Sequence, residues 1–62
     1  MISMDFKYKI NEKVKTGYGI GTIIDAKYEM AYDFRAYLIK YEDGKLYWAF
    51  EDSLEKAGDN ND

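Results

Sequence analysis

A chain of 62 residues with a net charge of −3 and neither cysteine nor histidine leaves few routes to stability or catalysis. A domain this small buries only ~60% of the surface that its unfolded chain exposes, so its core is thin. The two missing residue types exclude thiolate zinc sites, iron–sulfur clusters, thiol nucleophiles and histidine-based catalysis. Apolar packing must hold the fold, and the aromatic content of 18% is the main supply.

Composition also predicts where the protein works. No segment approaches the ~20 apolar residues that cross a bilayer. Residues 1–8 carry Asp5 and Lys7 and have no apolar stretch of the kind found in signal peptides. The lack of cysteine fits a reducing compartment. We therefore expect a cytoplasmic protein without membrane association, metal or cofactor.

The first half of the chain predicts strands broken by glycine. Residues 6–10 alternate apolar and polar side chains with period two, which is typical of a half-buried strand. Val14 resumes the pattern before Gly17. Residues 19–30 predict a longer strand in which two early glycines indicate a bulge, a bend or a close backbone approach. Its inward face stays open, because two adjacent isoleucines, Ile23 and Ile24, make the register ambiguous.

The second half predicts a hairpin. Residues 34–42 form the clearest strand, with Tyr37, Ile39 and Tyr41 on one face. Asp43-Gly44 is a tight hairpin signal, since both residues tolerate a positive φ, and residues 45–50 return. Leu54 then enters the core from a 3₁₀ or single helical turn. We expect residues 1–57 to form one domain and residues 58–62 to form a disordered acidic tail.

These elements predict an all-β fold of about five short antiparallel strands with a closing turn. A barrel is the expected arrangement, because closure removes the exposed edges that short strands would otherwise present.

The order of motifs resembles that of known small barrels. Lys13-Val14-Lys15-Thr16-Gly17 followed by residues 19–24 resembles the first hairpin of KOW-type and CarD-type domains. Residues 37–44, then Trp48 and residues 51–54, are similar to the central hairpin and closing turn of Tudor-like and chromo-barrel domains. The resemblance covers residues 6–57 and implies an SH3-like barrel. Barrels of this class bind RNA polymerase, ribosomal RNA, methylated lysine or proline-rich peptides. Small phage and mobile-element proteins without an assigned role have a similar order of motifs.

Residue spacing argues against a dinucleotide-binding site and against a metal or catalytic site. The three glycines at 17, 19 and 21 do not have the G-x-G-x-x-G spacing of a dinucleotide fingerprint, so a turn-and-bulge role is favoured. The carboxylates match no calcium-loop spacing, and a chain this short can scarcely build a catalytic cleft. We expect that the protein is not an enzyme and has no metal site.

The aromatic residues are the candidate binding residues. Tudor-like readers hold a methylated ammonium in a cage of aromatic rings beside an acidic residue, here Glu42 or Asp43. Core packing, a general protein-binding face and a true cage all remain open for these rings. Large rings in the predicted loop between the central strands also favour an interface. The candidate partner-binding residues are Tyr18, Tyr28, Tyr32, Tyr41, Tyr47 and Trp48.

Basic residues near the N-terminus have the character of a nucleic-acid contact. Residues 1–16 sum to a charge of +2, whereas residues 17–43 sum to −2 and residues 44–62 to −3. Basic side chains could track phosphates while neighbouring rings stack on bases, although the acidic remainder of the chain disfavours this. The candidate nucleic-acid contacts are Lys7, Lys9, Lys13, Lys15 and Arg35.

These features predict a small non-catalytic module that docks onto a protein partner through loop and sheet aromatics, as a monomer or weak homodimer. The resemblance to CarD-type domains implies the transcription machinery as one specific partner. Two alternatives stay open. One is a transcription-associated nucleic-acid-binding barrel that uses the Lys7–Lys15 strand. The other is a self-associating structural protein that uses an open sheet edge, with Phe34–Tyr41 as the candidate edge.

Overall fold

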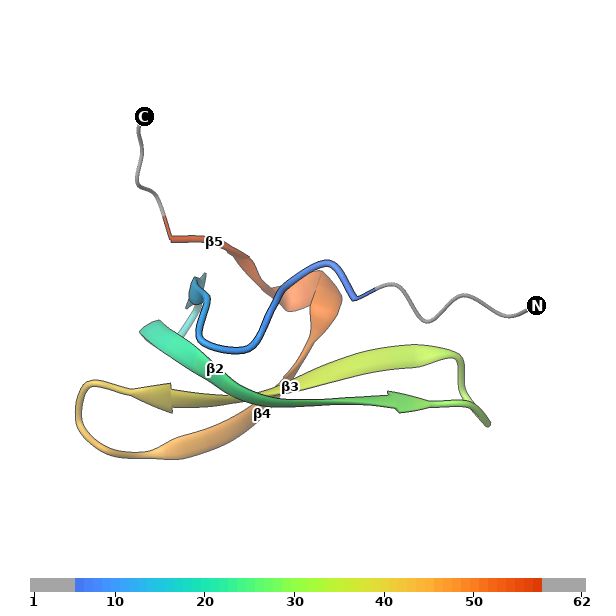
Figure 1. Cartoon of the computed structure of the whole chain (residues 1–62). Helices are drawn as coiled ribbons and strands as arrows, with labels where there is room; N and C mark the ends of the chain where they lie inside the picture. The colour runs from blue at the N-terminus through green and yellow to red at the C-terminus, as the bar shows by residue number, and fades with distance from the viewer. Residues whose placement is uncertain (1–5, 58–62) are drawn as a thin grey trace.

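The protein is all-β, as predicted. The computed structural model describes residues 6–57, and the predicted acidic tail at 58–62 lies outside them. Five antiparallel strands form one sheet, with a single 3₁₀ turn before the last strand (Figure 1). No helix among the described residues has the length and apolar character needed to cross a membrane. The elements are β1 (Lys13–Thr16), β2 (Gly19–Glu29), β3 (Phe34–Tyr41), β4 (Leu46–Phe50), η1 (Glu51–Ser53) and β5 (Glu55–Lys56).

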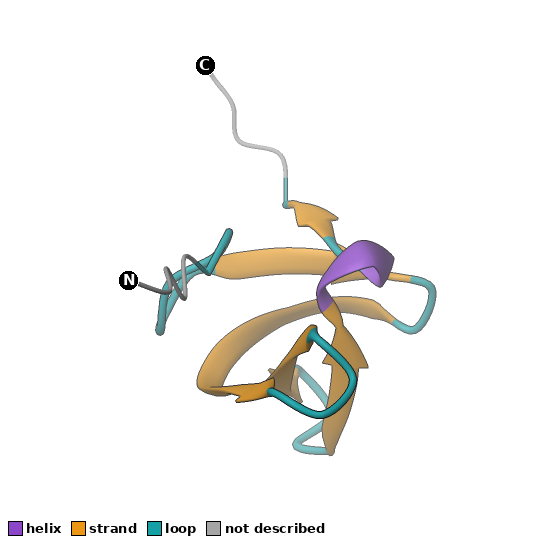
Figure 2. Ribbon diagram, turned by 90° about the vertical axis from the view of Figure 1, so that its right-hand side faces the viewer, coloured by secondary structure: helices purple, strands orange, loops and turns teal. Residues whose placement is uncertain are grey.

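The strands lie in the order β4-β3-β2-β1-β5. The sheet curves, so that η1 and β5 lie above the half made by β2, β3 and β4 (Figures 1 and 2). Its hydrogen-bonded ladder does not close, because β5 pairs with β1 and β4 pairs with β3. The expectation that closure would remove the sheet edges is therefore wrong. The edge predicted at Phe34–Tyr41 is also wrong, since β3 is paired on both sides.

The N-terminal segment is not the predicted strand. Phe6 and Tyr8 do point inward, and their rings lie 5.9 and 5.6 Å from the ring of Tyr37 in edge-to-face contacts. However, the backbone N–H groups of Lys7 and Tyr8 donate to side-chain oxygens, of Glu51 and Tyr37, and not to a neighbouring strand. The segment then turns sharply, with Asn11 at a φ of 76°. The predicted inward positions thus hold for Phe6 and Tyr8 but not for Ile10, which is exposed, and the segment is not a strand.

A bulge in β2 resolves the register that the sequence left open. Ile23 lies opposite Ile39 of β3, and the next paired residue is Asp25, opposite Leu38. Ile24 is the extra residue, so Ile23 is fully buried and Ile24 is exposed. The sequence had suggested a bulge at the glycines, but the bulge falls at this isoleucine pair.

Gly21 is needed where β2 passes closely over β3. A Cβ atom at this position would lie 2.4 Å from Cγ2 of Ile39 and 2.9 Å from the carbonyl oxygen of Lys40. Of the three alternatives that the sequence left open for these glycines, the close approach is the one found at Gly21. Gly44 has a φ of 88° in the turn that joins β3 to β4, which confirms the predicted Asp43-Gly44 hairpin.

The core lies between the curved sheet and the segments above it. Tyr37, at the centre of β3, is completely buried, and its hydroxyl donates to the carboxylate of Glu51. Burial and this hydrogen bond raise the pKa of Tyr37 to about 12. Leu54 reaches the core directly after η1, as predicted, and its carbonyl accepts a hydrogen bond from the Tyr8 hydroxyl at 3.0 Å. The buried cluster comprises Tyr8, Val14, Ile23, Tyr37, Ile39, Tyr41 and Leu54.

Candidate binding surfaces

An exposed apolar surface covers the side of β3 and β4 that faces away from the core. Because Tyr37, Ile39 and Tyr41 point inward, the alternate residues of β3 point outward. The register places Leu38 opposite Trp48, and cross-strand neighbours lie on the same face of a sheet. The outward side chains of β4 keep much of their surface in solvent: 49% for Leu46, 45% for Trp48 and 57% for Phe50.

Aromatic contacts join this surface to the turn between β2 and β3. Phe50 packs edge-to-face on Phe34, with ring centroids 4.9 Å apart. Phe34 in turn stacks on Tyr32, which is 75% exposed, at 6.1 Å. At the middle of the surface, the ammonium nitrogen of Lys27 lies 4.6 Å from the ring of Trp48. We call this surface the outer apolar face, and it comprises Tyr32, Phe34, Leu38, Leu46, Trp48 and Phe50.

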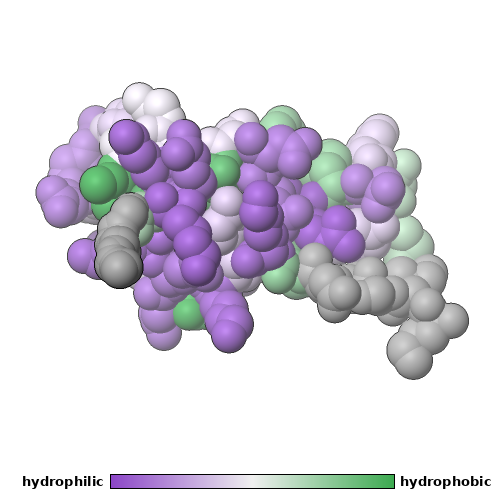
Figure 3. Space-filling view, turned by 90° about the horizontal axis from the view of Figure 1, so that it is seen from above, coloured by the Kyte–Doolittle hydropathy of each residue, from purple (hydrophilic) through white to green (hydrophobic). Residues whose placement is uncertain are grey.

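The outer apolar face ends at an edge strand without charge. β4 pairs with β3 on one side, and no other strand in the described part of the chain pairs with its second side. None of its five residues is charged, and its register with β3 contains no bulge. The opposite edge, β5, has only two residues, Glu55 and Lys56, and both are charged. The face seen from above, over β5, is largely hydrophilic (Figure 3).

A second aromatic group lies at the other side of β4, near the β3–β4 turn. We call Tyr18, Tyr41 and Tyr47 the tyrosine cluster. The ring of Tyr18 lies 4.6 Å from that of Tyr41 and 5.1 Å from that of Tyr47. The Tyr41 hydroxyl lies 2.9 Å from the hydroxyl of Thr16, which fixes it to the end of β1. Three of the predicted binding residues are thus brought together.

Asp43 fixes the ring of Tyr18, which is one of two exposed rings in this cluster. The Tyr18 hydroxyl donates to the Asp43 carboxylate at 2.6 Å, and the backbone N–H of Lys45 donates to its other oxygen at 3.0 Å. The hydrogen bond from Tyr18 is the main cause that holds the pKa of Asp43 below its ordinary value, and it raises the pKa of Tyr18 to about 12. The carboxylate is therefore already engaged with the cluster.

The tyrosine cluster does not form an open cage. A cage must leave room for an ammonium group between ring faces, each within about 6 Å of the cation. Here the rings contact one another, with centroids 4.6 to 6.0 Å apart, so they fill that space themselves. Trp48 belongs to the opposite face of β4. The three rings pack against one another at the surface, with Tyr41 buried and the other two rings partly exposed.

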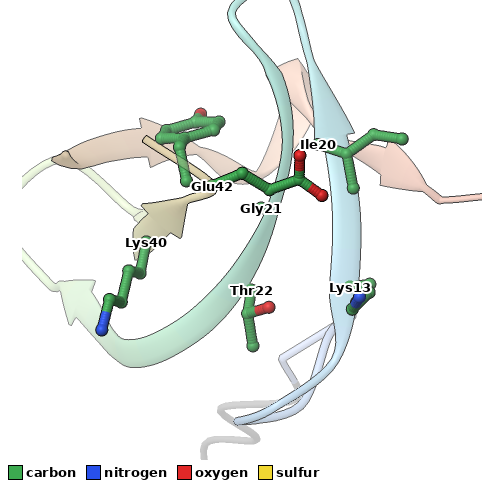
Figure 4. Close-up of a pocket in the computed structure, with 7 residues that line it drawn as sticks. Lys13, Ile20, Gly21, Thr22, Lys40 and Glu42 are labelled. Carbon is green, nitrogen blue, oxygen red and sulfur yellow. The ribbon is translucent and has the colours of Figure 1, made fainter. Parts of the chain in front are cut away.

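A hollow of about 270 Å³ lies next to this cluster, where β2 crosses between β1 and β3 (Figure 4). Its charged side chains are two lysines, Lys13 and Lys40, and one carboxylate, Glu42. Such a mixture favours neither an anion nor a cation. No group of three or more potential metal ligands occurs among residues 6–57.

The remaining predicted tyrosines do not share one loop. Tyr28 belongs to β2, where it is half-buried, and its hydroxyl donates to Asp33 at 2.7 Å. The guanidinium of Arg35 lies 5.0 Å from this ring and 5.9 Å from that of Phe6. Tyr32 alone occupies the exposed turn before β3, and it contributes to the outer apolar face.

The predicted basic contacts are divided in the same way. Lys13 and Lys15 are exposed on β1, but Lys15 lies opposite Glu55 of β5. Lys7 and Lys9 are exposed in the irregular segment that precedes β1. Arg35 is half-buried and packs on aromatic rings. The structure therefore provides no single basic strand of the kind predicted for Lys7–Lys15.

Sequence reasoning missed four residues of the outer apolar face: Phe34, Leu38, Leu46 and Phe50. The signal was present, because a tight hairpin after an inward Tyr41 fixes which residues of the return strand point outward.

Comparisons with protein-family models, with curated proteins and with solved structures found no match to this chain.

Proposed function

We propose that this protein is a non-catalytic module that binds a protein partner through the outer apolar face. The observation that carries the proposal is the exposure of three successive outward side chains of β4, Leu46, Trp48 and Phe50. Contiguous apolar surface of this kind marks interaction sites, and Trp and Tyr are frequent among the residues that dominate binding.

The finer assignment to the SH3-like class belongs to the same proposal. It is supported by one curved sheet of five antiparallel strands with a 3₁₀ turn before the last strand. In such a small domain, most inward side chains are required for the core, so binding residues must come from loops and outer faces. The outer apolar face meets that condition.

A protein partner is favoured over nucleic acid by charge and by ring contacts. The chain carries a net charge of −3, and capture of a phosphate backbone needs a basic surface. Two lysines lie at the outer apolar face: Lys27 lies over the ring of Trp48, and Lys40 is the cross-strand neighbour of Leu46. A partner that presents apolar side chains would therefore bury the outer apolar face while removing few charged groups from water.

Affinity recovery from a lysate of the source cells tests the proposal, with and without nuclease and with mass spectrometry as the readout. Wild type should retain the same proteins in both arms. Phe50→Ser should lose them, because it removes the most exposed ring of β4. Met30→Ser, an apolar-to-polar change in the turn at 30–33, is the matched control and should behave as wild type.

Two results would count against a protein-binding outer face. Equal recovery by wild type and Phe50→Ser would show that this face is not used. Recovery that disappears with nuclease would favour the nucleic-acid alternative and its lysines. Circular dichroism of each variant checks that loss of recovery does not reflect unfolding.

A further inference from the structure

We propose that β4 pairs antiparallel with β4 of a second copy of this chain, centred on Trp48, to form a ten-stranded sheet. The inference goes beyond the proposed function and does not rest on it, because strand pairing is made by the backbone edge of β4, to which the outer side chains only add.

The first support is the lack of any protection on this edge. Natural sheets guard exposed edges with charge, proline, bulges, very short strands or a covering segment. β5 has two of these devices, since it is two residues long and both are charged. Among residues 6–57, β4 has none of them: it is five residues long and uncharged, it pairs with β3 without a bulge, and no strand pairs with its second side. The chain contains no proline at all.

The second support is that β4 is complementary to itself. In a two-fold antiparallel pair centred on Trp48, Leu46 lies opposite Phe50 of the second copy, and Trp48 lies opposite its own counterpart. The outward side chains then form one unbroken apolar stripe. On the inward side, the large Tyr47 lies opposite the small Ala49 of the second copy.

The third support is charge at the two ends of the strand. Lys45 precedes β4 and Glu51 follows it. The register centred on Trp48 places Lys45 of one copy opposite Glu51 of the other, twice by symmetry. The Glu51 carboxylate already accepts hydrogen bonds from Tyr37 and from the backbone N–H of Lys7, so its contribution is attraction between the two charges without a new hydrogen bond. Opposite charges at cross-strand positions favour a pairing, whereas like charges oppose it. A register shifted by two residues would leave β4 residues without a partner and separate these charges.

The contact is small, so we expect a weak dimer. A standard stable interface buries about 800 Å² on each partner, and one pair of five-residue strands buries less. We expect a dissociation constant on the order of 10⁻⁵ M. The dimer would also join two outer apolar faces into one larger surface.

Single cysteine substitutions test both the pairing and its register, because the chain has no cysteine of its own. In the proposed register, the two copies of Trp48→Cys have Cα atoms about 5 Å apart, within the range that a disulfide spans. The two copies of Leu46→Cys are separated by four residues along the ladder, or about 13 Å, which is too far. Both positions are exposed on β4, so Leu46→Cys is a matched control.

Under mild oxidation at a protein concentration of about 0.3 mM, above the expected dissociation constant, Trp48→Cys should cross-link at least about tenfold faster than Leu46→Cys. Equal rates, or faster cross-linking of Leu46→Cys, would overturn the proposal. A mixture of Tyr47→Cys and Ala49→Cys provides a second measurement that keeps Trp48. It should give mainly the mixed disulfide, and a statistical mixture of products would contradict the register. The partner-recovery experiment does not depend on these results, so the two proposals fail separately.

Discussion

The two edge strands of this sheet differ in length and in chemistry. β5 is a charged pair of residues held against β1, and the face above it is largely hydrophilic (Figure 3). β4 is longer and uncharged, and its outward side chains are exposed. Charge along an edge discourages further strand pairing, and its absence permits pairing. On this contrast rests our proposal that interactions of this protein concentrate at the β4 end of the sheet.

The largest expected effect is a difference in the free energy of unfolding between substitutions on the two faces of the sheet. Tyr37→Ala should lower the free energy of unfolding by about 3–5 kcal/mol, because it empties a fully buried site and removes the partner of Glu51. Trp48→Ala should cost less than about 1.5 kcal/mol, since its ring is half in solvent. Urea unfolding measures both. Equal losses would contradict the assignment of Trp48 to an outer surface.

A smaller effect follows if β4 is made to resemble β5. Trp48→Lys places charge on the edge, and self-association should weaken by at least about tenfold, or about 1.4 kcal/mol. Tyr32→Lys introduces the same charge on the exposed turn away from β4 and should leave association unchanged. Sedimentation equilibrium gives both constants. An unchanged constant for Trp48→Lys would break the contrast between the edges.

The smallest effect concerns the turn that carries the chain into β4. The pKa of Asp43 is lowered in the folded protein, so its contribution to stability is present above the ordinary value of 3.8. That contribution is lost as the pH falls through the lower folded-state pKa. Tyr18→Phe removes the main hydrogen bond and should raise the pKa of Asp43 toward 3.8. A carboxyl ¹³C NMR titration measures the pKa, and an unchanged value would contradict the role of Tyr18.

Most of the fold could be predicted from local patterns. Alternation over residues 34–42 placed Tyr37, Ile39 and Tyr41 on one face, which the structure shows to be the inward face of β3, and Asp43-Gly44 predicted the hairpin that follows it. The need for a leucine to close the core predicted the turn before Leu54. These features depend on neighbours in sequence, which is why a single sequence reveals them.

The errors concern contacts between distant segments. Residues 6–10 alternate like a strand, but Glu51 and Tyr37 capture their backbone N–H groups, and no local pattern shows this. β5 was missed because two charged residues carry no strand signal. The candidate tyrosines were predicted as one set, yet they lie on different strands and turns and on separate surfaces.

The most direct test of the account is an NMR dilution series of the wild-type chain, from about 1 mM to about 20 μM, which brackets the expected dissociation constant. Amide resonances of residues 45–51 should shift with concentration, while those of Glu55 and Lys56 should not. Unchanged spectra, or shifts at β5 and not at β4, would contradict the difference between the two edges on which the account depends.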